Sequence, residues 1–321
     1  MMETVLLYAL PVIIGWVLDI LLGDPAWLPH PVVLMGKAIA FFEKWLNKGN
    51  HRVLKGALTS IFLISATAAL FFFLIHFTDK LPLICAIIIR SVFIFFFLAG
   101  TTLIREVRAV FKAVDRSLEE GRKQVARIVG RETSGLSGQE IRTAALETLA
   151  ENLSDGVIAP LFWLMVGGIP AMAAYKMVNT LDSMIGYRTE RYREFGRIAA
   201  QIDDFANWIP ARLTAFLMVL CSGKLKTFKF VHKYARHHAS PNSGYPESAL
   251  AGILDIRFGG PHTYLGEVID KPFIGDNPRE VTYKDMVTAA RVNRLSELAM
   301  IILTAAAGTV ARYFSAIYLL T

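Results

Sequence analysis

Three carboxylates recur at intervals of four residues near the middle of the sequence. Glu147, Glu151 and Asp155 have the i, i+4, i+8 spacing that places side chains on one face of a helix. The preceding Ser137-Gly-Gln-Glu140 is a capping box and predicts a helix that begins at Ser137. Neighbouring like charges destabilise a helix unless a cation compensates them, and carboxylate oxygens suit magnesium. We expect these three residues to be metal ligands at the edge of an apolar run; a solvated acidic face is the alternative.

A second acidic pattern, Gln201-Ile-Asp203-Asp204-Phe-Ala-Asn207, also stands just before an apolar run. Asp203 and Asn207 are one helical turn apart, and this spacing can hold a magnesium–phosphate unit. Four-residue acidic patterns are common, so the spacing alone is a weak signal. We expect Asp203 and Asp204 to be further metal ligands.

Polar residues are also dense directly after the apolar run between these two patterns. Lys176, Asn179 and Asp182 are followed there by Arg188 and Arg191. Arginine forks bind carboxylates and phosphates bidentately, so this segment is a candidate anion site. Interfacial anchoring of the membrane could explain the arginines alone, but it does not explain Asn179 and Asp182.

The N-terminal region carries ionisable residues in and after an apolar run. Asp19 falls late inside that run, and Asp24 and His30 follow it. An ionisable residue inside a membrane span is costly and is therefore a functional candidate, which applies equally to Arg90. A structural ion pair explains either residue equally well, and we do not expect Arg90 to be catalytic.

The segment 240–248 combines turn residues, including Asn242 and Ser243, with a proline and the start of a helix. Free backbone N–H groups at such a junction can cradle an anion, although a plain loop-to-helix junction is the alternative. His237 and His238 precede it without the spacing of a metal site, and we expect them to be surface residues.

The chain that positions these residues is apolar. Its 321 residues are 54% hydrophobic and 19% charged, with a mean hydropathy of +0.44, which is too apolar for an ordinary soluble domain. A helix of about twenty apolar residues crosses a bilayer. We expect spans at 4–22, 57–77, 81–104 and 295–320, and weaker or re-entrant segments at 157–174 and 208–221. The predicted fold is an all-α polytopic integral membrane protein with large helical cytoplasmic loops, forming a single membrane-embedded domain over residues 1–321. The first run lacks the basic flank and cleavage site of a signal peptide.

The basic residues predict how the chain is oriented. They cluster after the first and third spans, and basic residues near span ends mark the cytoplasmic side. Two complete crossings by 157–174 and 208–221 would place the arginines of 175–207 outside the cell. The sequence Gly167-Gly168-Ile-Pro170 predicts a helix break in the first of these segments, and broken backbone is tolerated where protein or a water-filled cavity covers it. We therefore favour a re-entrant or partial pair that leaves 175–207 in the cytoplasm.

Several function classes are disfavoured. The net charge of +7 follows the membrane-flanking distribution and does not indicate nucleic-acid binding. Cys85 and Cys221 are too few for a zinc site or a disulfide framework, and we expect them to be small core residues. The sequence has no P-loop, dinucleotide-binding fingerprint or hydrolase elbow, so it does not locate an ATP site.

Five segments, in this order, closely resemble the adenosylcobinamide-phosphate synthase family of cobalamin biosynthesis, also called the CbiB or CobD family. One departure is Glu132, where the family pattern has aspartate after arginine. The segments span nearly the whole chain and are LDILLGDPAWLPHPVVLMG, RETSGLSGQEIRTAALETLAENLSDGVIAPLFW, YKMVNTLDSMIGYR, FGRIAAQIDDFANWIPARL and SPNSGYPESALAGIL.

The resemblance implies an integral membrane enzyme that joins adenosylcobyric acid to (R)-1-amino-2-propanol phosphate, or to the free amino alcohol, with ATP and Mg²⁺. Amide formation of this kind requires a cation to neutralise phosphates, groups that hold two anionic substrates, and a base. On this basis we expect Asp182, Glu151 and Lys176 to be catalytic. The expected substrate-binding residues are Asp24, His30, Asn179, Arg188, Arg191, Asn242 and Ser243.

The resemblance also implies a multi-pass protein of a bacterial or archaeal cell membrane with its active site on the cytoplasmic side. Its expected partners are the corrinoid, the amino alcohol or its phosphate, and the lipid bilayer, with no nucleic acid. Homo-oligomers and association with later cobalamin enzymes stay open. One alternative is a non-enzymatic membrane signalling protein of the AmpE type, which would not need the dense polar motifs. A transporter is disfavoured because the sequence shows no paired halves.

Overall fold

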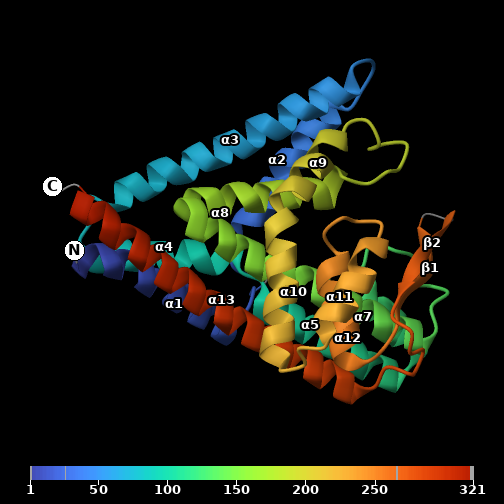
Figure 1. Cartoon of the computed structure of the whole chain (residues 1–321). Coiled ribbons are helices and arrows are strands. Elements are labelled where there is room, and N and C mark those ends of the chain that lie inside the picture. The colour runs from blue at the N-terminus through green and yellow to red at the C-terminus, as the bar shows by residue number, and fades with distance from the viewer. Residues whose placement is uncertain (1, 26, 265–266, 319–321) are drawn as a thin grey trace. The chain divides into compact units, whose positions relative to one another are not determined.

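The structure is a computed structural model that describes residues 2–25, 27–264 and 267–318 (Figure 1). It is predominantly helical with one two-stranded hairpin, which confirms the predicted all-α class. The helices are α1 (Met2–Leu22), α2 (Pro31–Leu46), α3 (Arg52–Thr78), α4 (Leu83–Phe97), α5 (Gly100–Arg116), α6 (Leu118–Val125), α7 (Gly138–Leu153), α8 (Ala159–Ile185), α9 (Arg197–Ala206), α10 (Trp208–Ser222), α11 (Thr227–Tyr234), α12 (Gly244–Leu254) and α13 (Tyr283–Tyr318). A π-helical turn (Ser154–Ile158) joins α7 to α8, and a 3₁₀ turn (Ala235–His237) follows α11.

The described chain packs as two compact units. The single membrane-embedded domain over residues 1–321 stays a prediction. The first unit comprises Met1–Ala99, Ala159–Asn207 and Met300–Thr321, and the second comprises Gly100–Ile158 and Trp208–Ala299. Each unit has its own buried apolar core. The chain passes from one unit to the other several times, so neither unit is continuous in sequence.

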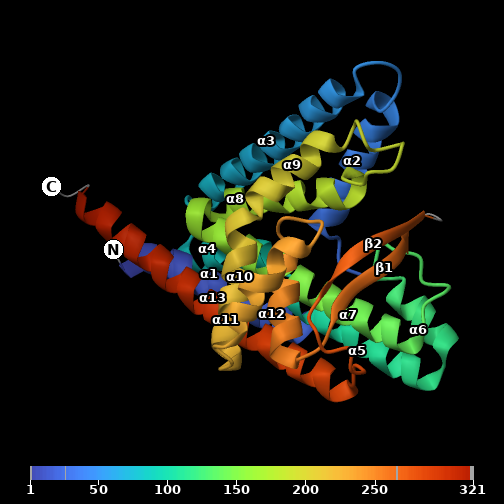
Figure 2. The same ribbon diagram turned by 45° about the vertical axis from the view of Figure 1, so that its right-hand side comes forward.

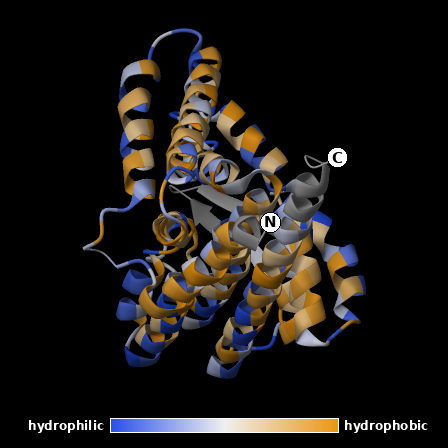
Figure 3. Cartoon of the chain, turned by 90° about the vertical axis from the view of Figure 1, so that its left-hand side faces the viewer, coloured by the Kyte–Doolittle hydropathy of each residue, from blue (hydrophilic) through white to orange (hydrophobic). Residues whose placement is uncertain are grey.

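The helices are long and apolar enough to identify a membrane protein. Within the described residues, three candidate spans could cross a bilayer by length and composition: Arg52–Thr78, Leu83–Arg116 and Gly138–Ile185. The pair α9–α10 also qualifies together but is bent by 45°, and Leu6–Leu22 is a shorter apolar helix. Figure 3 shows long apolar stretches along the helices.

The first unit pairs α1 with α4 and α3 with α8, and α2 and α9 also contact α8. The expected span 57–77 lies inside α3, whose Phe62 and Phe73 are more than half exposed, as lipid-facing side chains are. The expected span 81–104 is divided: α4 ends before Leu98, and α5 begins at Gly100.

Helix α8 is broken where the sequence predicted a break. Gly167 and Gly168 have non-helical backbone angles, and Gly168 has φ 70° and ψ −165°, a conformation that requires glycine. Near the break, the Tyr8 hydroxyl donates to the carbonyl oxygen of Leu164 at 3.3 Å. A cavity of about 390 Å³ lies beside the break. A protein hydrogen bond and a cavity thus accompany irregular backbone in an apolar segment, and such backbone is tolerated at membrane depth where protein or a cavity covers it.

Arg90 forms a structural ion pair, which is one of the two roles that the sequence allowed for it. Its guanidinium is buried, pairs with Asp79, and donates to the Thr78 hydroxyl at 3.0 Å and the Leu7 carbonyl oxygen at 3.4 Å. These contacts tie α4 to the end of α3 and to α1, so the charge is neutralised inside the first unit.

In the second unit, α5, α6 and α7 pack together, and α12 packs against α10 and α11 (Figure 2). The capping box at Ser137 is present and α7 begins at Gly138, which confirms the predicted helix start. The sequence did not predict the antiparallel hairpin of β1 (Phe258–Tyr264) and β2 (Glu267–Ile274). Its glycines and proline mask the alternation that marks a strand.

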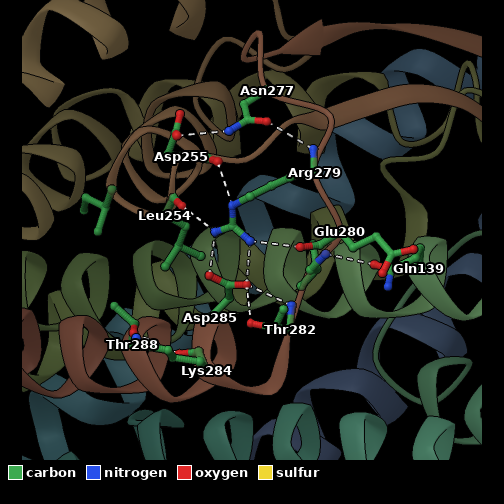
Figure 4. Close-up of polar contacts among 12 residues, drawn as sticks. Gln139, Leu254, Asp255, Asn277, Arg279, Glu280, Thr282, Lys284, Asp285 and Thr288 are labelled. Atoms are coloured by element: carbon green, nitrogen blue, oxygen red, sulfur yellow. Dashed lines mark hydrogen bonds and ion pairs between the residues drawn. The ribbon is translucent and has the colours of Figure 1, made fainter.

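Arg279 holds the segment between β2 and α13 in place (Figure 4). Its guanidinium forms a bidentate pair with Asp285 at 2.7 and 2.9 Å. It also donates to the carbonyl oxygens of Leu254, Asp255 and Glu280 at 2.6, 3.1 and 2.9 Å. These five bonds use every N–H donor of the side chain.

The structure contradicts two expectations about burial: that both cysteines lie in the core, and that His238 lies on the surface. Cys85 is exposed on α4 and Cys221 is only partly buried, so neither is a core residue; an apolar helix face in a membrane protein can be exposed to lipid. The His238 side chain is nine-tenths buried rather than on the surface, and its Nε2 lies 3.6 Å from the Glu247 carboxylate.

Candidate functional site

The predicted site residues fall in both units. The first unit holds Asp24, His30, Lys176, Asn179, Asp182, Arg188, Arg191, Asp203 and Asp204, and the second holds Glu147, Glu151, Asp155, Asn242 and Ser243. Each set is described within its own unit.

The largest described cavity of the first unit has a volume of about 1130 Å³ and is rich in arginine. We call it the arginine cavity, after the four arginines that line it: Arg52, Arg188, Arg193 and Arg197. Asp204, Glu190, Glu194, Gln201 and Tyr187 line it as well. The lining comes from the start of α3, the loop after α8, and α9. Of the predicted residues, the cavity brings together Arg188 and Asp204.

Two close backbone approaches shape the loop that carries these arginines. A Cβ on Gly196 would lie 1.6 Å from the Ile185 carbonyl oxygen, so the two ends of the loop meet only because residue 196 is glycine. A Cβ on Gly56 would lie 1.8 Å from the Phe195 carbonyl oxygen, so α3 also packs directly on the loop. Phe195 itself is fully buried. The loop is therefore a packed element of the first unit.

Arg191 does not line the arginine cavity but anchors its loop. Its guanidinium makes two 3.0 Å bonds to the carboxylate of Glu43, whose side chain is only 9% exposed. The hydrogen bond from Arg191 lowers the pKa of Glu43, and burial partly opposes this effect. Asn47 bonds both Glu43, at 2.9 Å, and the Arg191 carbonyl oxygen, at 3.1 Å. Arg52 donates to Asn47 at 2.8 Å and to the same carbonyl oxygen. Sequence reasoning missed Glu43, which lies 148 residues from Arg191.

Asp203 and Asp204 have different surroundings although they are adjacent. Asp203 is buried and accepts a 3.0 Å bond from the Asn207 amide, whose oxygen accepts a 2.8 Å bond from the Tyr175 hydroxyl. Asp204 is exposed and lines the arginine cavity near enough to Arg188 for their charges to interact. Of the two carboxylates, Asp204 is the accessible one.

The remaining predicted residues of the first unit lie on α8 and near α2. Lys176, Asn179 and Asp182 are partly buried along successive turns of α8. The Asp182 carboxylate lies at the end of the helix, where a Cβ on Gly186 would approach its Oδ1 to 2.0 Å. His30 caps α2 by accepting the Val32 N–H at 3.2 Å, and its Nε2 lies 3.6 Å from Asp24.

In the second unit, Glu147 and Glu151 of the acidic stripe accept hydrogen bonds from protein groups. Glu147 pairs with Arg131 at 3.0 Å and accepts the Gly259 N–H at 2.8 Å. Glu151 accepts the Ser243 hydroxyl at 2.8 Å, which brings together two residues predicted from separate patterns. Asp155 lies in the π-helical turn, where the 3.6-residue period that defined the stripe no longer applies.

A smaller cavity of about 480 Å³ lies beside the 240–248 segment and contains Arg212, which sequence reasoning missed. Its guanidinium is 4.3 Å from the ring centroid of Trp208 and 4.2 Å from that of Tyr245. It also lies 3.5 Å from the Asn242 side-chain oxygen. The available signal was a lone arginine in the apolar run 208–221.

Within the described residues, no three His, Cys, Asp or Glu side chains converge as a metal site. Magnesium in nucleotide sites is held by only one or two carboxylates together with substrate phosphates and water. Asp204, exposed among arginines, fits such a site. At Glu147 and Glu151 a metal would replace the hydrogen bonds from Arg131, Gly259 and Ser243. The predicted metal ligands stay predictions.

The comparisons with known proteins agree with one another. The family model described as CobD/CbiB protein matches residues 12–293. The cobalamin biosynthesis protein CobD of Geobacter metallireducens is 44% identical over 268 residues, which are 81% of this chain and 84% of that protein. CobD of Halalkalibacterium halodurans is 38% identical over 286 residues, which are 87% of this chain and 90% of that protein. CbiB of Salmonella arizonae is 37% identical over 289 residues, which are 87% of this chain and 91% of that protein. No solved structure matches the chain.

The family match extends over both units and includes every predicted site residue. The relatives named cobalamin biosynthesis protein are each matched over more than four-fifths of their length. This chain, with its long apolar helices, belongs to the CobD/CbiB family and is a membrane protein of cobalamin biosynthesis.

Proposed function

We propose that this protein joins adenosylcobyric acid to (R)-1-amino-2-propanol phosphate, or to the free amino alcohol, in an ATP-dependent amide-forming reaction. The observation that carries the proposal is the family match over residues 12–293. The arginine cavity supports it, because cationic side chains suit the anionic substrates of such a reaction.

The proposed chemistry has two steps. A propionate oxygen of the corrinoid attacks the terminal phosphorus of ATP, which gives an acyl phosphate and releases ADP. The amine nitrogen then attacks the acyl carbon and forms the C–N bond. The bond between that carbon and the phosphate oxygen breaks, phosphate leaves, and the nitrogen loses a proton. Each step brings anions together, so arginines that offset the developing charge lower the barrier.

The chain's own residues supply the groups that this chemistry needs. Arg188 would hold an anionic substrate group, and Asp182 or Glu151 would accept the proton of the attacking amine. Lys176 would place a positive charge beside the carboxylate that reacts. Magnesium, bound together with ATP, would neutralise phosphate charge, and Asp204 is the accessible carboxylate that could hold it.

We place the reaction on the cytoplasmic side of a bacterial or archaeal cell membrane. The supporting observation is the basic segment 175–207, because lysine and arginine near span ends mark the cytoplasmic side. ATP is also available on that side. Homo-oligomers and association with later cobalamin enzymes are compatible with this placement.

The test is turnover by the purified, detergent-solubilised full chain. The protein is given adenosylcobyric acid, ATP and magnesium with either the amino alcohol or its phosphate, and the amide is detected by mass spectrometry. We expect product that depends on ATP and on magnesium, and comparison of the two amines identifies the preferred one. Folded protein that forms no amide from either amine would refute the proposal.

A further inference from the structure

The arginine cavity is lined by four arginines and three carboxylates, so its described lining has an excess of positive charge. Arg193 and Arg197 line it, and within the described residues neither side chain makes a hydrogen bond or an ion pair. Arg191, two residues before Arg193, is by contrast fully engaged by Glu43. Arg191 therefore anchors the loop, whereas Arg193 and Arg197 line the cavity.

The unpaired arginines are held on fixed backbone. Arg197 is the first residue of α9, where the helix dipole adds positive potential. Arg193 lies on the loop that the Glu43–Arg191 pair anchors and that meets itself at Gly196. A cationic site that is positioned before its ligand arrives loses less entropy on binding, which suits a specific anion rather than a passing counterion.

The cavity is also lined by carboxylates, and these restrict the chemistry of the ligand. Glu190, Glu194 and Asp204 line it, and Asp204 lies near Arg188, so the wall offers acidic groups beside the basic ones. A phosphate that travels with a cation complements such a wall. Two ligands of the proposed reaction have this character: the amino alcohol phosphate, with its own ammonium group, and ATP with magnesium. The volume of about 1130 Å³ admits either, since ligand pockets commonly measure about 300–1,000 Å³.

We infer that the arginine cavity binds a substrate phosphate group through Arg193 and Arg197, together with Arg188. The site itself follows from the cavity and its charges, and only the identity of the ligand rests on the proposed function. Arg191 and Glu43 act as positioning residues that hold the loop and do not touch the ligand.

The experiment measures binding to the full-length protein in detergent by titration calorimetry. The probes are a non-hydrolysable ATP analogue with magnesium, 1-amino-2-propanol phosphate and the free amino alcohol. The test variants are Arg193→Gln and Arg197→Gln, which remove charge while keeping much of the side chain. Arg116→Gln is the matched control, because Arg116 is an exposed arginine of the second unit that pairs with Glu120. Gel filtration and circular dichroism establish that each variant is folded.

We expect each test variant to raise the Kd of one phosphate-bearing probe by about 10–100-fold, in line with the loss of a charged hydrogen bond. The control should change it by less than about twofold. The free amino alcohol should show no such dependence on the arginines. The probe that is affected identifies the source of the phosphate, and adding salt should weaken its binding.

Three results would overturn the inference. The first is wild-type protein that binds neither phosphate probe. The second is a Kd that does not change in either variant. The third is a loss confined to binding of a short-chain phosphatidylglycerol, titrated as a fourth probe in the same detergent, which would assign the arginines to lipid headgroups. Amide formation by wild-type protein together with any of these results leaves the proposed function intact. If phosphate binding depends on the arginines but no amide forms, the phosphate site is supported and the proposed function is refuted.

Discussion

Replacing Arg279 should destabilise the second unit measurably. The variant Arg279→Met leaves five acceptors without their donor: both carboxylate oxygens of Asp285 and three backbone carbonyl oxygens. Removing one partner of a fully buried ion pair costs about 3–5 kcal/mol. The Arg279 side chain is 35% exposed, so water can reach some of the freed acceptors, whereas the Asp285 side chain is only 10% exposed. Two bonds from Thr282 also stay on Asp285. We therefore expect a loss of about 2–3 kcal/mol.

Arg279→Lys should lose less, about 1–2 kcal/mol, because lysine keeps the charge but has three donors at one point instead of five in a fork. The assay is urea unfolding in a mild detergent, followed by circular dichroism, with Arg116→Met as an exposed-arginine control that should change stability by less than about 0.5 kcal/mol. The double variant Arg279→Met, Asp285→Leu should recover part of the loss, since it removes the stranded carboxylate. A loss of less than about 0.5 kcal/mol in Arg279→Met would refute the reasoning.

The same pair predicts the acid sensitivity of the second unit. Burial by itself tends to raise the pKa of Asp285, but the hydrogen bonds from Arg279 and Thr282 outweigh it, and the pKa lies below the ordinary 3.8. Because the pKa is lowered on folding, the stabilisation is complete above pH 3.8 and is lost as the pH falls through the folded-state value. Asp285→Asn should remove this part of the pH dependence. If the loss of stability at low pH is unchanged in that variant, other carboxylates control it.

Further outcomes follow for the site and the topology. Glu151→Gln keeps an acceptor for Ser243 but removes charge, and turnover should fall about 10²–10⁴-fold and recover partly with added magnesium; unchanged turnover in both this variant and Asp182→Asn would show that the catalytic assignments are wrong. A cysteine at the 59%-exposed Glu194, in a cysteine-free background, should resist impermeant thiol reagents in whole cells, and rapid external labelling would contradict the cytoplasmic placement. Glu43→Gln should raise the KM for a phosphate-bearing substrate more than it lowers kcat, because it loosens the loop without touching the ligand; equal effects on both would argue against a positioning role. The pKa of Glu43 is lowered on folding, so its anchoring pair should fail only below about pH 4.5, which proteolysis of the loop at graded pH would detect.

Local signals predicted the local features of this fold. The capping box at Ser137 fixed the start of α7 because the two groups that satisfy each other are three residues apart. The Gly167–Gly168 break was also visible, since glycine followed by proline weakens a helix wherever it occurs. In both cases the energetic cause lies within one helical turn.

Contacts between distant segments could not be predicted in the same way. Glu43 reads as an ordinary helix-surface carboxylate, and only folding brings it to Arg191. Glu147 was expected to require a metal cation, yet the structure supplies the guanidinium of Arg131. The sequence gives residue types and their spacing along one element, but the partner of a charge depends on which elements pack together.

The interleaving of the two units has a consequence for how the protein is made. The first unit needs residues from three separate stretches, so it is incomplete until the residues from Met300 onward have been made. The second unit is interrupted by 159–207, which belongs to the first. No single cut therefore releases either unit whole, and loop closure over such separations is slow compared with local helix formation. Helices can form as they emerge from the ribosome, but the packing that completes the first unit must wait for α13.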